Sequence, residues 1–247
     1  MIREDGVNIC FSPTVLQLVE IEEWLKEESK KGKGFYCNWD LIQQAHSRNQ
    51  MAIVEVETNA IGFVIWYETE RSGSIEIIEV KSSHRKKGYG KLLIDQLYKY
   101  FLRKNIHVVR LVCSPPSSEK IWRKLGFTGF PDIAAFGRFN IRENIHLYKV
   151  IVPSADPGNS NLEVDEFIEL WDDAPNQAEN REAAWSWPLS FKDGTRELVK
   201  PIIWPASEDW KIGWVKGENV MRECKIKYWS DQQNISFSNF VIINKMP

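Results

Sequence analysis

The sequence predicts an α+β fold, a mixed sheet flanked by helices, for residues 1–152, and a small all-β sandwich or barrel for residues 162–247. Helical and extended apolar patterns alternate in the first part, whereas only short extended patterns follow it. Seven of the eleven tryptophans lie in the last 86 residues, and the net charge changes from +3 over residues 1–161 to −5 beyond them. The turn-rich run "PSADPGNSN" at 153–161 is therefore predicted to be a linker between two domains.

The composition is typical of a soluble globular protein, with 43% hydrophobic and 27% charged residues. A net charge of −2 gives no general attraction to nucleic acids or membranes, so we expect neither as a partner. No apolar run reaches the ~20 residues that a bilayer span requires, and the first residues lack a signal-peptide pattern, which favours a cytoplasmic location. The four cysteines show no CxxC spacing, so we expect free thiols and no metal site.

The first elements are a short strand at 7–11 and a helix that follows "SPT". Ser12 is the predicted N-cap of this helix and Pro13 its first residue, since proline lacks an N–H that the first turn leaves unbonded anyway. A second helix is predicted over 39–48. The apolar stripe of the first helix consists of Val15, Leu18, Ile21 and Leu25.

Three strands, "MAIVEVET", "AIGFVIWYE" and "SIEIIEV", are expected next, with Asn59 and Gly73 at or near the turns. A helix "YGKLLIDQLYKYFLRKN", a strand "HVVRLVCS", a short helix "SSEKIWRKLG" and a strand "ENIHLYKVIV" follow them. The predicted order is thus β, α, α, three strands, α, β, α, β.

The last 86 residues contain five or six short alternating patterns and no convincing helix. The stretch "WSWPLSF" places its large apolar residues on one face, before a turn at Asp193-Gly194, and Cys224, Ile226 and Tyr228 also alternate. Trp185 and Trp187 could stack on a sugar or amine ligand, but we favour their filling a thin core. No family is recognised for this part.

The stretch "HRKKGYGK" at 84–91 joins a predicted strand to a predicted helix. The first N–H groups of a helix lack intrahelical acceptors and carry partial positive charge, and glycine lets the backbone approach a ligand. Such a loop suits a pyrophosphate, although a solvated basic turn is the alternative. Neither a GxxxxGK[ST] nor a GxGxxG motif is present, which excludes the usual P-loop and Rossmann fingerprints.

The segment "RKKGYG" resembles the [QR]xxGx[GA] loop of the GNAT superfamily of acyl-CoA N-acyltransferases. The strand "IEIIEV" before it and the helix after it match that family's motif A, and "VVRLVCS" with "EKIWRKLGF" is similar to motif B. The predicted element order over residues 1–152 also resembles the family's layout. These four features occur in the family's order.

The resemblance implies transfer of an acetyl group from acetyl-CoA, as co-substrate, to a primary amine that attacks the thioester directly. Backbone groups from Ile78 to Val80 would hold pantetheine and the acetyl oxygen. The loop would bind the phosphates through Arg85, Lys86, Lys87, Gly88, Tyr89, Gly90 and Lys91.

Direct attack requires a base for the ammonium and an acid for the thiolate. Glu76 and Glu79 are the candidate bases; strict alternation gives Glu76 the parity of Ile78 and Val80, the face that looks toward the acceptor in relatives, and turns Glu79 away. Trp122 occupies the position of the family's acid tyrosine, and an indole N–H is too weak an acid for this task. Ser117, Ser114 or Ser118 could instead relay a proton through water.

The replacement of the family's acid tyrosine by Trp122 favours an alternative function, that of a non-catalytic acyl-CoA-binding or interaction module. The sequence leaves the acceptor open among small amines, antibiotics, amino acids and protein lysines. Phe35, Tyr36 and Trp39 could line its site or merely pack beside the core. A homodimer also stays open.

Overall fold

The computed structural model describes residues 6–32, 34–69, 71–130, 145–158, 164–229, 235–236 and 240–247. Its contacts divide the chain into two units, 1–112 and 113–247, each of which is described by itself. The predicted domain boundary at 153–161 stays a prediction. Residues 155 and 158, within that stretch, bond to residues 201 and 186 of the second unit.

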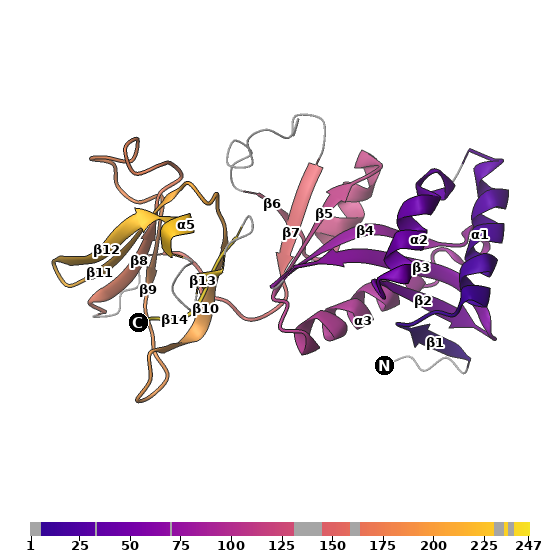
Figure 1. Cartoon of the computed structure of the whole chain (residues 1–247), viewed down its shortest axis with the longest axis horizontal. Helices are drawn as coiled ribbons and strands as arrows, with labels where there is room; N and C mark the ends of the chain where they lie inside the picture. Colours follow the sequence, from indigo (N-terminus) through magenta and orange to yellow (C-terminus); the bar gives the residue numbers. More distant parts are fainter. Residues whose placement is uncertain are drawn as a thin grey trace. The chain divides into compact units, whose positions relative to one another are not determined.

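The first unit consists mainly of a sheet with helices on both faces (Figure 1). The α+β prediction is confirmed. The elements in chain order are β1 (Val7–Cys10), α1 (Val15–Ser29), η1 (Tyr36–Asn38), α2 (Trp39–Ser47), β2 (Met51–Val56), β3 (Asn59–Glu68), β4 (Ser72–Val80), η2 (Ser82–His84), α3 (Tyr89–Arg103) and β5 (Val108–Cys113).

Within the first unit, the strands of the mixed sheet have the order β1-β2-β3-β4-β5. Strands β1 to β4 are antiparallel neighbours, whereas β4 and β5 run parallel. A parallel pair needs a crossover between its strands, and α3 supplies it. The basic loop therefore lies where β4 ends and the crossover helix begins.

Helix α1 begins two residues later than predicted. Its N-cap is Thr14, whose side chain accepts from the N–H of Gln17 at 3.3 Å while the Gln17 amide oxygen accepts from the Thr14 N–H at 2.7 Å. The prediction of Ser12 and Pro13 was wrong because this capping box satisfies two N–H groups at once. The stripe shifts accordingly: Val15 is 66% exposed, and the buried side is formed by Leu18, Ile21, Trp24, Leu25 and Glu28.

The two faces of the sheet carry separate apolar layers. Helices α1 and α2 cover the face that presents Ile53, Phe63 and Ile77, and these residues belong to one buried cluster. Helix α3 covers the other face, where the rings of Phe101 and Trp66 meet edge to face at 6.0 Å. A residue on β4 therefore points toward α1 and α2 or toward α3 according to its register.

A bulge changes that register in the middle of β4. Ile75 pairs with Trp66 and Ile77 with Ile65, so that Glu76 is the extra residue of the bulged strand. Ile75 consequently shares the α3 face with Trp66, whereas Ile77 shares the α1 and α2 face with Ile65. Strict alternation along "SIEIIEV" is thus wrong, and Glu79, paired with Phe63, faces α1 and α2.

The second unit begins with η3 (Pro116–Ser118), α4 (Glu119–Lys124), β6 (Thr128–Gly129) and β7 (Ile145–Val150). It continues with β8 (Glu166–Leu170), β9 (Trp185–Pro188), β10 (Glu197–Pro205), β11 (Lys211–Lys216), β12 (Asn219–Lys225), α5 (Ile226–Trp229), β13 (Ile235–Ser236) and β14 (Phe240–Lys245). These later strands form a sheet of order β10-β14-β13 and one of order β12-β11-β8-β9, which confirms antiparallel β structure in this part.

The predicted strand through Ile226 and Tyr228 is wrong, since β12 ends at Lys225 and one helical turn follows. The interpretation of the tryptophans as core holds for Trp187, which is fully buried, while Trp185 is partly buried against the same cluster and stacks on Trp210 at 5.7 Å. Large rings thus fill the space that two short sheets enclose.

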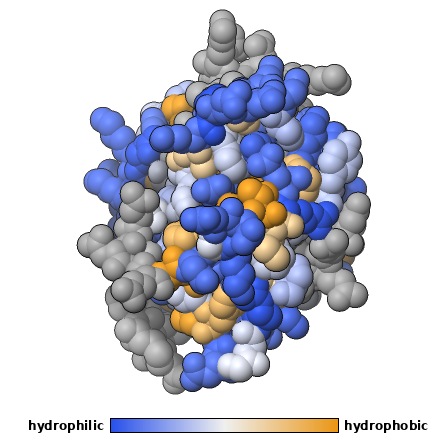
Figure 2. Space-filling view, turned by 90° about the vertical axis from the view of Figure 1, so that its left-hand side faces the viewer, coloured by the Kyte–Doolittle hydropathy of each residue, from blue (hydrophilic) through white to orange (hydrophobic). Residues whose placement is uncertain are grey.

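The outer surface of the C-terminal strands is mixed in character. Figure 2 shows mostly hydrophilic atoms with small separate hydrophobic areas. Exposed apolar residues of this part include Val199, Val220, Met221 and Tyr228. Of the helices in the described ranges, none is long and apolar enough to cross a membrane.

Candidate functional site

Strands β4 and β5 are paired over only part of their length and then diverge. Their pairing runs from Ser72 with Val108 to Ile75 with Leu111, and β4 then continues alone on this side to Val80. The stretch from Glu76 to Val80 therefore offers an unpaired strand edge, which contains the predicted pantetheine-binding residues Ile78 and Val80. The carbonyl of Val80 is already engaged, since it accepts from Nε of Arg85 at 2.7 Å.

The basic loop follows this edge and turns into α3 through two left-handed residues. Lys86 has φ +64° and Gly88, the N-cap of α3, has φ +87°. A Cβ at Gly88 would meet no atom within 4 Å, so the backbone is open to solvent there. No side chain caps α3, its first turn contains no acidic residue, and in the described structure no hydrogen bond is recorded from the backbone N–H groups of 86–91.

The loop side chains divide into two kinds. Lys86 and Lys87 are exposed, and Lys91 pairs with Asp95 at 2.6 Å. Tyr89, by contrast, is buried, so its side chain anchors the start of α3 in the core. The loop can thus bring exposed ammonium groups and backbone N–H groups without a recorded partner to one anion; its predicted binding of phosphate stays a prediction.

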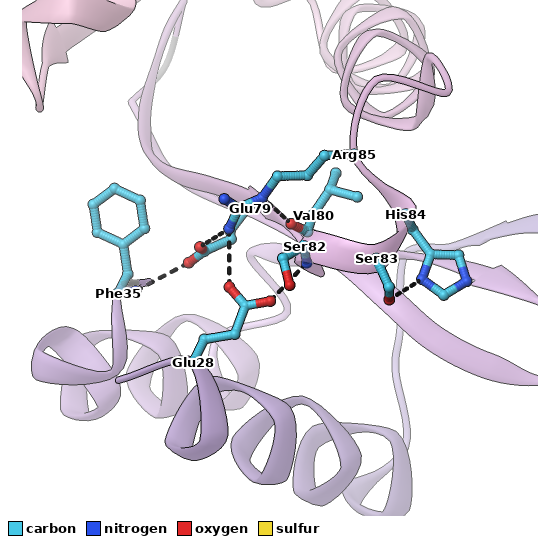
Figure 3. Close-up of polar contacts among 8 residues, drawn as sticks. All are labelled: Glu28, Phe35, Glu79, Val80, Ser82, Ser83, His84 and Arg85. Carbon is cyan, nitrogen blue, oxygen red and sulfur yellow. Dashed lines mark hydrogen bonds and ion pairs between the residues drawn. The ribbon is translucent and has the colours of Figure 1, made fainter. Parts of the chain in front are cut away.

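Arg85 does not point its guanidinium at the cradle. Its Nη2 lies 2.9 Å from Oε2 of Glu28 and 3.0 Å from Oε1 of Glu79, so the two carboxylates share one nitrogen (Figure 3). The second oxygen of each carboxylate is also occupied: Oε1 of Glu28 accepts from the N–H of Ser82 at 2.6 Å, and Oε2 of Glu79 accepts from that of Phe35 at 3.0 Å. We call Glu28, Glu79 and Arg85 the carboxylate–arginine network.

The network is largely removed from water. The side chains of Glu28 and Glu79 are only 8% and 5% exposed, whereas that of Arg85 is 41% exposed. Burial raises the pKa of Glu79, the hydrogen bond from Phe35 and the charge of Arg85 oppose this, and the charge of Glu28 adds to it. A carboxylate with a raised pKa is a stronger base than an exposed one.

Sequence reasoning missed Glu28. Its signal was present, because positions 18, 21, 25 and 28 continue one apolar stripe at helical spacing, and a glutamate in that stripe requires a buried partner. The partner comes from a loop 57 residues away, which no local pattern reveals.

The other predicted catalytic residues lie in different surroundings. Glu76 is exposed at the bulge of β4. Ser117 is exposed in η3 of the second unit, while Trp122 in α4 of that unit is buried with its ring against Phe127 at 5.2 Å. His84 bonds through Nδ1 to Ser83, and partial burial, with help from Lys87 and Lys81, lowers its pKa.

The segment between α1 and α2 passes beside the network. A Cβ at Gly34 would lie 3.4 Å from Oε1 of Glu79, and Gly34 adopts φ +80°. Phe35, Tyr36 and Trp39 are partly buried against the α1–α2 core, so they close this side of the first unit. An open pocket on the outside of α1 is lined by Glu23, Lys26, Glu27, Ser29, Lys30 and Tyr36.

The acetyltransferase (GNAT) family model matches residues 18–127, which include the unpaired edge, the loop and the network. Ard1 from Thermoplasma volcanium is a solved structure similar to the chain, with 16% identity over 60% of this chain and 99% of Ard1 and a TM-score of 0.46. PaiA N-acetyltransferase from Thermoplasma acidophilum, solved with coenzyme A, has 15% identity over 59% of this chain and 99% of its own, with a TM-score of 0.47.

N-acetylglutamate synthase from Neisseria gonorrhoeae, complexed with coenzyme A and N-acetyl-glutamate, has 15% identity and a TM-score of 0.49. That likeness covers 61% of this chain and 36% of the synthase. No curated protein matches the chain.

Proposed function

Residues 18–127 form a domain of the GNAT acetyltransferase family, and on that premise we propose that the protein transfers an acetyl group from acetyl-CoA to a primary amine. The acceptor is a small molecule or a protein amine. A cytoplasmic location, the absence of nucleic-acid and membrane partners, and a two-domain organisation with residues 162–247 as an accessory domain belong to the same proposal. A homodimer stays an open alternative.

The observation that carries this proposal is the loop at the start of α3. Six successive residues, 86–91, present backbone N–H groups without a recorded partner in the described structure, beside the exposed ammonium groups of Lys86 and Lys87. The free space around Gly88 admits a large anion. These features fit the pyrophosphate of coenzyme A, and the unpaired edge from Glu76 to Val80 fits its extended pantetheine arm.

Acetyl-CoA, when bound, supplies an electrophilic thioester; the chain must orient it and move protons. We assign the base to Glu79 or Glu76, and we favour Glu79 because its burial raises its pKa toward the working range. Both oxygens of Glu79 are bonded, so proton transfer to it requires either a relaying water or a displaced Phe35. Ser117 is the proposed proton relay to the thiolate, and a thiol of pKa ~8.5 can also leave unprotonated.

A non-catalytic acyl-CoA-binding module is the second candidate. The buried Trp122 favours it, because this residue replaces the family's acid tyrosine and its indole cannot protonate a thiolate. A screen of primary amines that detects release of coenzyme A separates the two. Release above the hydrolysis background with any amine removes the binding-module candidate.

Titration with acetyl-CoA by calorimetry tests the proposal, with Gly88→Glu as the disabling variant. The substitution places a side chain and a negative charge in the cradle and forces φ +87° on a residue that disfavours it. Gly217→Glu is the matched control, since Gly217 also has a positive φ of +57° and free space around its Cα but lies in the β11–β12 turn. We expect binding by the unaltered protein and the control, and at least tenfold weaker binding by Gly88→Glu. No binding by the unaltered protein would refute the function.

A further inference from the structure

We propose that Glu28 is a positioning residue that sets the shape of the basic loop and thereby the affinity for acetyl-CoA. The inference rests on the proposed function but concerns a residue outside the loop and outside the unpaired edge. Glu28 lies on α1 and touches the entry to the loop rather than the cradle itself (Figure 3).

Glu28 holds the turn that leads into the loop at both of its ends. Its Oε1 accepts from the N–H of Ser82, the first residue of η2, and its Oε2 accepts from Arg85, which directly follows η2. One carboxylate therefore fixes the start of η2 and the first residue of the basic loop at once. The distances of 2.6 and 2.9 Å are those of charge-assisted hydrogen bonds.

Arg85 links Glu28 to two further acceptors, the carbonyl of Val80 and the carboxylate of Glu79. Its Nε donates to the carbonyl of Val80 at 2.7 Å, and its Nη2 reaches both Glu28 and Glu79. The guanidinium is a rigid planar group, so three acceptors fix its plane, and the plane in turn fixes the backbone at residue 85. Lysine could not reproduce this geometry, because its single ammonium cannot span the carbonyl and the carboxylates in the same way.

Few other side chains hold the loop. Lys86 and Lys87 have no recorded hydrogen bond or ion pair in the part of the chain that the structure describes, and Gly88 has no side chain. The loop is therefore anchored at its ends only, by Arg85 on one side and by the buried Tyr89 on the other. Loss of the first anchor releases residues 86–88, whose N–H groups must point together to bind one phosphate group.

The buried charge makes Glu28 hard to replace. Glu28 and Glu79 face one another across a single guanidinium, so two carboxyl groups, 8% and 5% exposed, share one cationic partner. Removal of Glu28 leaves Arg85 paired with Glu79 alone and leaves the N–H of Ser82 without its acceptor. Both effects favour a different position of the loop entry.

Two variants test the two contacts of Glu28. Glu28→Gln offers one acceptor oxygen to two donors, the N–H of Ser82 and Arg85, and turns an amide NH2 group toward the other, so that one of the two contacts is lost. Ser82→Pro removes the backbone donor alone, and it is compatible with the extended ψ of +131° at Lys81 and with the first position of a helical turn. Glu27→Gln is the matched control, since Glu27 is exposed on the same helix and pairs with Lys30.

The experiment measures the Kd of acetyl-CoA by calorimetry and the melting temperature of each variant and of the Glu28→Gln/Ser82→Pro double variant. We expect Glu28→Gln to weaken binding at least tenfold and Ser82→Pro about threefold, with Glu27→Gln unchanged. The double variant should weaken binding by less than the product of the two single effects, because both act through one residue.

The outcomes are distinguishable from those of the function test. If the unaltered protein fails to bind acetyl-CoA, the proposed function is refuted. If it binds and folded Glu28→Gln binds equally well, Glu28 positions nothing and the inference is wrong. A merely structural role would lower the melting temperature but leave the Kd of the remaining folded protein unchanged, so a fall in stability without a change in Kd also overturns it.

Discussion

The backbone N–H of Phe35 donates to Oε2 of Glu79 at 3.0 Å, although 44 residues separate the two in the chain. This bond joins the segment before α2 to the end of β4, and with Arg85 on Oε1 each oxygen of Glu79 accepts one hydrogen bond. The strongest candidate base is thus engaged by one main-chain donor and one side-chain donor. We expect an amine to reach it through a water or after Phe35 or Arg85 has moved.

The pH profile of the transfer reaction should identify the base. Because the base must be unprotonated and the pKa of Glu79 is raised, kcat/KM is expected to rise with pH through a pKa above 4.5. Glu79→Gln should lower kcat/KM about 10²-fold or more and abolish that rise. If Glu76→Gln does so instead, the exposed glutamate at the bulge is the base and the assignment to Glu79 fails.

Substitution of Gly34 should disturb the surroundings of the Glu79 carboxylate. Gly34→Ala places a Cβ 3.4 Å from Oε1 of Glu79 and strains a residue at φ +80°, with an expected loss of about 1–2 kcal/mol in unfolding free energy. Gly32→Ala is its control, because Gly32 has φ +66° but no atom within 4 Å of the added carbon. Urea unfolding and kcat of both variants separate the two effects. Only Gly34→Ala should also lower kcat, and equal kcat values would contradict a role for this contact.

The tryptophans of the second unit should contribute to stability rather than to ligand binding. Trp187 is fully buried, so Trp187→Ala is expected to cost about 3–5 kcal/mol, and Trp185→Ala less because Trp185 is only partly buried. Denaturant unfolding measures both. Calorimetry with a panel of sugars and amines tests the alternative, that Trp185 stacks on a ligand. A saturable binding heat that Trp185→Ala abolishes would support this alternative.

The fall in unfolding free energy at acidic pH should depend on Glu166. Its carboxylate accepts from Arg196 and, at 2.9 Å, from Nε1 of Trp214; the Arg196 bonds, more than the Trp214 bond, lower its pKa. A lowered folded-state pKa contributes stability that is present above the ordinary value of 4.5 and lost as the pH falls through the folded-state pKa.

Glu166→Gln should therefore flatten the loss of stability in acid and cost about 1–3 kcal/mol near neutral pH, since Arg196 is partly exposed and keeps some solvation. Melting temperatures from pH 3 to 8 measure this. Glu169→Gln offers the opposite sign, because burial raises the pKa of Glu169, so its contribution is lost as the pH rises. Parallel profiles for the two variants would contradict the argument.

Local patterns predicted much of the fold and part of the site. Apolar periodicity located the helices and strands of the first unit, and the glycines of "RKKGYG" located the loop, because both depend on residues close together in sequence. The carboxylate–arginine network was not predictable in this way, since Glu28 and Arg85 meet only after α1 has packed on the sheet. The turn at Ile226–Trp229 was missed because its apolar residues also alternate.

The bulge of β4 determines which side of the sheet Glu79 faces. Straightening the strand with Glu76 retained would shift Glu79 out of register with Phe63 by one residue and turn its carboxylate to the opposite side of the sheet, away from Phe35 and Glu28. Deleting Glu76 would instead close the bulge and keep the pairs of Ile77 and Glu79 with Ile65 and Phe63. Replacing Glu76 by another residue leaves that phase intact. A chain one residue shorter at this position would therefore keep the carboxylate–arginine network without a bulge, whereas a chain of the present length keeps it only with the bulge.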